Sequence, residues 1–382
     1  MQLANSLSKL SKGSKISING ALTLDKLIKK PNIHKTFENH IKTISQKYKK
    51  LELVAKKINN PPFIDTSFCD PDIKKWIVTG IENKTIETLQ LKTTSPRPGF
   101  ILNCCISNKD KVFINKSLNR KADRLHVLSE MLYPNQMIKI DLWFALHRKV
   151  FPSKSKEKLT STHLNSGATD GKHIWLWREE ESDKVLVHEV IHQARMHSEK
   201  YDQVSKMHQR FRVTKDSMLR PFEAFTEWLA ICFHIGFVMC ELNLAITKTN
   251  MTQLYQNEYL FGVMQTAKIL NHFGFKSWEE FIRKKESSNV VEQTTDAISY
   301  ICIKTALLND SAYWFEKNKV ISSLTGNTPA WMQCCDVNMF FDWIDHAIND
   351  PIHTKNVNIA LQKVNLAKYP PKTLRMSAIG ES

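Results

Sequence analysis

The segment "VLVHEVIHQARMH", residues 185–197, places His188, Glu189 and His192 inside an apolar run. Residues four apart on an α-helix lie about 40° apart around its axis, so both histidines are expected on one face. Two imidazoles at that spacing can bind one Zn²⁺ at roughly 2.0–2.1 Å. Glu189 would lie beside the metal, where its carboxylate can take a proton from water. The spacing predicts two metal ligands and a general base.

Chance is the alternative explanation of this HExxH pattern, which arises in roughly 3% of chains of this composition. The histidines would then be two hydrogen-bonded residues of a helix core. The surroundings do favour a buried helix, with Asp183 as its expected N-cap. Its apolar members are Val185, Leu186, Val187, Val190 and Ile191. We prefer the metal site because chance accounts poorly for all three polar residues in such a helix.

The stretch "RPFEAFTEWLAICFHIGFVM", residues 220–239, predicts a second buried helix. Pro221 suits its first turn, where the missing N–H costs nothing. Glu223 and Glu227 are four residues apart, on one face of an otherwise aromatic and aliphatic surface. Because unpaired buried carboxylates are strongly disfavoured, we expect a cation to face them. This helix is therefore expected to supply the third ligand that a two-histidine zinc site lacks.

In these two segments the chain resembles the gluzincin metallopeptidases, the zincin group that includes thermolysin, neprilysin and the aminopeptidase-N type. Those families pair HExxH with a downstream Glu, as "HEVIH" is followed here by "EAFTEW". The resemblance implies that Glu223 is the third zinc ligand and that Glu227 orients a ligand imidazole, that of His188. The family usually has Asp where Glu227 stands, so the two glutamates can exchange roles. A metzincin pattern does not fit, because Arg195 and Ser198 occupy its Gly and His positions.

The resemblance also implies an α+β fold. A zincin-like metallopeptidase domain has a small mixed sheet, a zinc helix and a mainly helical lower subdomain, here with a helical N-terminal extension. Residues 174–177, "IWLW", predict a β-strand because β-branched and aromatic residues crowd them. In zincins the strand before the zinc helix is commonly the edge on which a peptide substrate pairs. We expect that edge here, with an ordinary core strand as the alternative.

A hydrogen-bond donor for the scissile carbonyl oxygen is expected downstream of the third ligand. Peptide hydrolysis builds negative charge on this oxygen, and a Tyr, His or Arg donor usually assists the metal. By position, the candidates are Tyr255, Tyr259, His272 and Tyr300. The sequence does not choose among them.

Composition limits the class of protein. The chain has 382 residues, of which 42% are hydrophobic, as in an ordinary globular protein. The longest apolar stretch, residues 228–240, is too short for a membrane span, and no apolar region of a secretory signal is visible. The 8 Cys include no CxxC pair, which favours a reducing compartment. We expect an intracellular protein, cytoplasmic or virion-associated; its richness in Lys, Ile and Asn suggests an AT-rich genome such as that of a large DNA virus.

The net charge of +16 is concentrated at the two ends of the chain. Residues 1–60 carry 13 Lys against 3 acids, and residues 351–382 carry 5 basic residues against 1 acid. Such an arm can bind nucleic acid or an acidic partner. The alternative, which we prefer, is a folded helical layer with its lysines outward.

The chain is expected to divide into four segments. These are a basic, mainly helical N-terminal segment (1–60, including "KKLELVAKK"), an α+β part with strands at "KWIVTGI" and "KVFIN" (61–164), the zincin-like domain (165–350) and an exposed basic tail (351–382).

These features together predict a zinc-dependent peptidase that acts on a peptide or protein substrate, in which Glu189 takes the proton of a zinc-activated water. One alternative is a structural or binding protein on a zincin scaffold, with zinc as a staple. Another is a nucleic-acid-binding virion component that uses the basic N-terminal arm. Glu189 favours the enzyme, because a purely structural metal site needs no proton acceptor.

Overall fold

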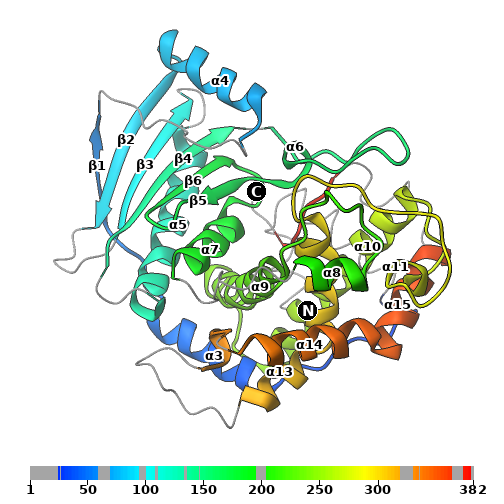
Figure 1. Ribbon diagram of the computed structural model, residues 1–382. Coiled ribbons are helices and arrows are strands. Elements are labelled where there is room, and N and C mark those ends of the chain that lie inside the picture. The colour runs from blue at the N-terminus through cyan, green and yellow to red at the C-terminus, as the bar shows by residue number, and fades with distance from the viewer. Residues whose placement is uncertain are drawn as a thin grey trace.

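The computed structural model describes residues 25, 27–58, 69–93, 100–107, 111–132, 136–145, 147–194, 204–318, 330–334, 336–363 and 373–379. A mixed β-sheet lies beside a large group of helices (Figure 1). The fold is therefore α+β, as the sequence predicts.

Six strands form the sheet in the order β1-β2-β3-β4-β6-β5. The strands β3, β4 and β6 run parallel to one another, whereas the pairs β1–β2, β2–β3 and β5–β6 are antiparallel. The bounds are β1 Leu53–Lys57, β2 Ile86–Thr93, β3 Phe100–Ser107, β4 Ile138–Ala145, β5 Gly167–Thr169 and β6 His173–Arg178.

Along the chain, the described helices up to α9 are α3 (Lys35–Lys47), α4 (Pro71–Glu82), α5 (Lys111–Leu132), α6 (Ser161–Leu164), α7 (Ser182–Gln193), α8 (Val204–Arg210) and α9 (Pro221–Glu241). Those that follow are α10 (Lys248–His272), α11 (Trp278–Phe281), the π-helix η1 (Ile298–Ile303), α12 (Lys304–Asn309), α13 (Ser311–Asn318), the 3₁₀-helix η2 (Ala330–Met332), α14 (Val337–Asn349) and α15 (Pro351–Lys363).

Strand β6 is buried on both faces of the sheet. Ile174 and Leu176 join the main core on the side of α5 and α7, and Trp175 and Trp177 pack in a second cluster under α4 (Figure 1). This explains its continuous apolar sequence. The strand lies between β4 and β5, so its predicted place at the sheet edge is wrong. The short strand β5 forms the edge instead, because it is the last strand in the order.

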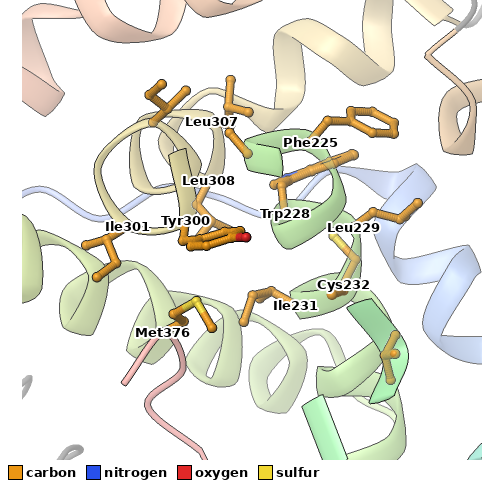
Figure 2. Packing of buried hydrophobic residues seen from close by; sticks show 14 of the residues in the cluster. Phe225, Trp228, Leu229, Ile231, Cys232, Tyr300, Ile301, Leu307, Leu308 and Met376 are labelled. Atoms are coloured by element: carbon orange, nitrogen blue, oxygen red, sulfur yellow. The ribbon is translucent and has the colours of Figure 1, made fainter. Parts of the chain in front are cut away.

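Helix α9 is the centre of the helical part. Every side chain from Pro221 to Met239 is buried, and α3, α7, η1 and α12 all pack against it. Figure 2 shows Phe225 and Trp228 of this helix in the core. Its length and hydropathy would allow a membrane span, but its apolar window lies entirely inside the protein, as in a core helix. The described residues thus contain no clear transmembrane segment.

Several predicted elements differ in the structure. The expected strand at residues 75–81 belongs to α4, which Asp70 caps by accepting from the Asp72 N–H at 2.9 Å. Ile73 and Ile77 are buried four residues apart, so the apolar period is helical. The expected strand at 111–115 likewise has the helical backbone of α5. The reverse holds for "KKLELVAKK", where β1 replaces the predicted helix by pairing with β2.

The preferred interpretation of the basic N-terminal segment holds for α3. This helix buries Phe37, Ile41 and Ile44 and leaves Lys35 and Lys42 exposed, so it is a folded layer with lysines outward. Residues 1–24 of the predicted basic arm lie outside the described residues.

The predicted exposed tail at residues 351–382 is wrong in its described parts. Residues 351–363 form α15, which packs against α10 and α14. Residues 374–379 are buried. Residues of all four expected segments, such as Ile41, Leu125, Leu229 and Val357, belong to one hydrophobic cluster. The described parts of the first and last segments therefore pack onto the same core as the centre.

Candidate metal centre

Helix α7 is held in place by a buried ion-pair cluster at its N-terminal end. The helix follows Glu181, which has a left-handed backbone with φ 63°. Asp183 is not the N-cap, so that prediction is wrong; it lies in the first turn and faces α5. Its carboxylate is 2.5 Å from Lys121 Nζ and 3.1 Å from Arg120 Nε. These contacts outcompete a capping role because they neutralise a charge that is fully buried.

Three side chains from α7 and α9 converge on one point. His192 Nε2 lies 3.0 Å from both His188 Nε2 and Glu223 Oε2, and His188 Nε2 lies 3.3 Å from the same carboxylate oxygen. Donor atoms bound to zinc at roughly 2.0–2.1 Å in a tetrahedral arrangement are about 3.3 Å apart. The triangle therefore has nearly the dimensions that one metal ion requires, and the residues are those that the sequence predicts.

Glu227 lies on the other side of the His188 ring. Its carboxylate accepts from His188 Nδ1 at 2.8 Å and from Lys184 Nζ at 2.5 Å. Because a carboxylate only accepts, Nδ1 carries the hydrogen and Nε2 is directed to the donor triangle. A carboxylate behind a ligand histidine fixes its ring and raises its basicity. Of the two glutamates, Glu223 thus lies at the triangle and Glu227 behind it.

The two carboxylates control the charge of His188. Burial lowers the pKa of this imidazole, but hydrogen bonds to Glu223 and Glu227 outweigh burial and raise the pKa to about 9. Burial raises the pKa of Glu223, yet His192 and His188 hold it well below its usual value. At neutral pH the metal-free centre thus holds a carboxylate beside a protonated His188. A metal ion must displace that proton to bind.

Glu189 is buried next to His188, beside the triangle. Its side chain has no hydrogen bond among the residues that the structure describes. Burial raises the pKa of its carboxyl. The backbone of β5 is close, since a Cβ added at Gly167 would lie 3.1 Å from Glu189 Oε1 and 2.7 Å from Val185 Cγ1. The carboxylate therefore lies close to the backbone of β5.

A small pocket opens at this place. It has about 260 Å³ of empty space including its open mouth. Its lining comes from the entry to β5, from α7, from η1 and from the C-terminal end of the chain: Asn165, Ser166, Gly167, Lys184, Val185, His188, Glu189, Tyr300 and Met376.

Tyr300 is the predicted donor that the fold brings to this pocket. It lies on the π-helix η1, and its ring centroid is 5.7 Å from that of His188. Insertions of π-helix are frequent at functional sites. Burial and the nearby carboxylate of Glu223 raise the pKa of the phenol, so it keeps its hydrogen as a donor at neutral pH.

The other three predicted donors have structural partners elsewhere. The Tyr255 hydroxyl donates to the Leu308 carbonyl at 2.8 Å, and the Tyr259 hydroxyl accepts from Asn356 at 2.9 Å. The His272 ring lies 2.8 Å from the backbone oxygen of Glu157. None of the three lines the pocket.

Arg220 and Asp296 belong to the site, although the sequence analysis does not identify them. Arg220 Nη2 lies 3.0 Å from Glu223 Oε1 and 2.8 Å from Asp296 Oδ2. The guanidinium thus holds the second oxygen of Glu223. Its place three residues before Glu223 on a helix is a signal that could have revealed it. Asp296 has no such signal, because it comes from a distant segment.

Comparisons of the chain with protein-family models, curated proteins and solved structures found no match.

Proposed function

We propose that the protein is a zinc-dependent peptidase of the gluzincin type. The observation that carries the proposal is the convergence of His188, His192 and Glu223 within one ion's reach. Beside them lies Glu189, whose carboxylate has no hydrogen bond among the residues that the structure describes. Two imidazoles and a carboxylate are the ligand set of catalytic zinc sites that keep a further position open. The small pocket beside Glu189 provides space for water and substrate.

Bound zinc would supply Lewis acidity, which polarises a carbonyl group and activates water. Glu189 accepts a proton from the attacking water and passes it to the leaving amine. Burial raises the pKa of its carboxyl above the usual value, which makes it a stronger base for that proton. Tyr300 donates a hydrogen bond to the carbonyl oxygen on which charge develops. Arg220 and Glu227 keep Glu223 and His188 in position.

Strand β5 offers the edge on which an extended peptide substrate can pair. It ends the sheet order and borders the pocket through Gly167. Strand addition gives affinity through backbone hydrogen bonds and specificity through pockets for alternate side chains. The absence of a side chain at Gly167 keeps this edge close to Glu189, where the scissile bond must lie.

The test is cleavage of a peptide library by the purified full-length protein. Removal of metal with a chelator should abolish cleavage, and added Zn²⁺ should restore it. The His192→Ala variant should stay inactive at the same zinc concentration, because it lacks one ligand. Cleavage that survives complete metal removal, or a zinc-loaded wild-type protein that cleaves no peptide, would contradict the proposal.

A further inference from the structure

The C-terminal strap, residues 373–379, supplies one wall of the pocket. All of residues 374–379 are buried, although they follow α7 by more than 170 positions. Met376 of the strap lines the pocket together with Glu189 and Tyr300. Figure 2 shows Met376 and Tyr300 within the same buried cluster. The pocket is therefore incomplete without the strap.

Buried charged side chains hold the strap by its backbone. Glu181 accepts from the N–H groups of Met376 at 2.9 Å and Ser377 at 2.7 Å. Lys304 donates to the Met376 carbonyl at 2.8 Å. Both charged residues are almost completely buried, so these hydrogen bonds are strong and fix the backbone at this residue.

The next residues of the strap are held in the same way. Glu258 accepts from the Ser377 hydroxyl at 2.8 Å and from the Ala378 N–H at 2.9 Å. His234 Nε2 lies 2.9 Å from the Ile379 carbonyl oxygen. These anchors bind main-chain atoms and the Ser377 hydroxyl, so none of them involves the Met376 side chain. That side chain is left to shape the pocket.

The wall that Met376 forms is apolar. Val185 and Tyr300 add further apolar surface, and the charge of Lys184 is paired with Glu227. An anionic substrate side chain would lose its hydration there beside the Glu189 carboxylate. Because Met376 lines the pocket, a shorter side chain at this position would leave more room for a substrate side chain.

We propose that Met376 is a specificity-determining residue, which restricts the substrate side chain in this pocket to small apolar ones. This inference rests on the proposed peptidase function. Shortening Met376 deepens the pocket at a site whose backbone stays anchored. The preference should then move toward larger apolar side chains, such as Leu or Phe.

The experiment compares cleavage of matched peptides that differ only in one side chain, Ala against Leu or Phe, by zinc-loaded full-length variants. Met376→Ala should raise the ratio of kcat/KM for the larger over the smaller side chain by about tenfold or more. Met376→Val should give a smaller shift in the same direction. Met376→Leu, which conserves volume, should stay close to the wild-type ratio.

Met264→Ala is the matched control, because it removes the same atoms from a fully buried methionine of α10 that does not line the pocket. Its ratio should equal that of the wild type. An unchanged ratio in Met376→Ala and Met376→Val, with the wild type active, would overturn the role of Met376 and leave the peptidase proposal intact. A zinc-loaded wild type without cleavage would end both proposals.

Discussion

Helix α7 carries two buried acidic residues in opposite electrostatic situations. Asp183 contacts Lys121 and Arg120, and although burial raises the pKa of its carboxyl, these cations hold it well below the usual value. Glu189, two turns later, has no hydrogen bond among the described residues, and burial raises its pKa. A paired buried charge serves stability. An unpaired buried charge beside groups that could bind a metal ion is typical of a catalytic site.

The largest effect that separates the two acids should come from Glu189→Gln. The amide keeps the shape of the side chain but cannot accept the proton, so kcat should fall by about 10²–10⁴-fold. Zinc content should stay at the wild-type value, because position 189 is not a ligand. Thermal unfolding should not shift downward, since an unpaired charge is removed. Full turnover by this variant would contradict the assignment of the general base.

Asp183→Asn should act on stability instead. It removes the buried negative charge that Lys121 and Arg120 contact, which costs about 3–5 kcal/mol in the free energy of unfolding. Urea denaturation followed by far-UV circular dichroism measures this change. The fraction that is still folded should bind zinc. If the denaturation midpoint did not move, the structural role of this ion-pair cluster would be refuted.

A third variant, Glu227→Gln, tests the positioning of His188. It weakens the contact to His188 Nδ1 and removes the charge that Lys184 neutralises. Zinc affinity should fall by about 10–100-fold, as for other carboxylates behind ligand histidines. Chelator competition measures it. Glu241→Gln is the control and should leave zinc affinity unchanged. Glu241 also lies on α9, but at its other end, where it pairs with Arg124 of α5.

The smallest expected effect is the change in zinc affinity for each unit of pH. His188 has a pKa raised to about 9 in the metal-free protein, so below pH 9 a proton occupies the imidazole that the metal needs. As pH falls from 8 to 6, affinity should therefore drop about tenfold per unit. Isothermal titration calorimetry at several pH values measures it. An affinity that does not change over this range would show that His188 is not a ligand.

Helical periodicity explains why the sequence predicts the site as far as it does. A spacing of four places His188 with His192, and Glu223 with Glu227, on common faces whatever the fold around them. The choice between the two glutamates needs the packing of α7 against α9, which no local pattern contains. Lys184, four residues before His188, was a usable signal for the residue that holds Glu227. Met376 had none, since only tertiary packing brings the strap to the pocket.

The same reasoning explains the errors in the fold. The stretch at residues 75–81 contains Ile and Val, which favour strands, but the cap at Asp70 and the buried Ile73 and Ile77 belong to a helix. The β6 strand was predicted correctly from its apolar run, yet a run apolar on both faces indicates a central strand rather than an edge. Propensity alone therefore fixes neither the type of an element, which the helical period decides at Ile73 and Ile77, nor its neighbours in the sheet.

The zinc content of the full-length protein tests the metal centre most directly. The protein is stripped with a chelator, incubated with Zn²⁺, passed through a desalting column and measured by mass spectrometry of the metal. We expect one zinc ion per chain in the wild type and in Glu189→Gln, and loss of the ion in His192→Ala. A wild type that retains no zinc, or a His192→Ala variant that retains as much as the wild type, would contradict a metal centre at His188, His192 and Glu223.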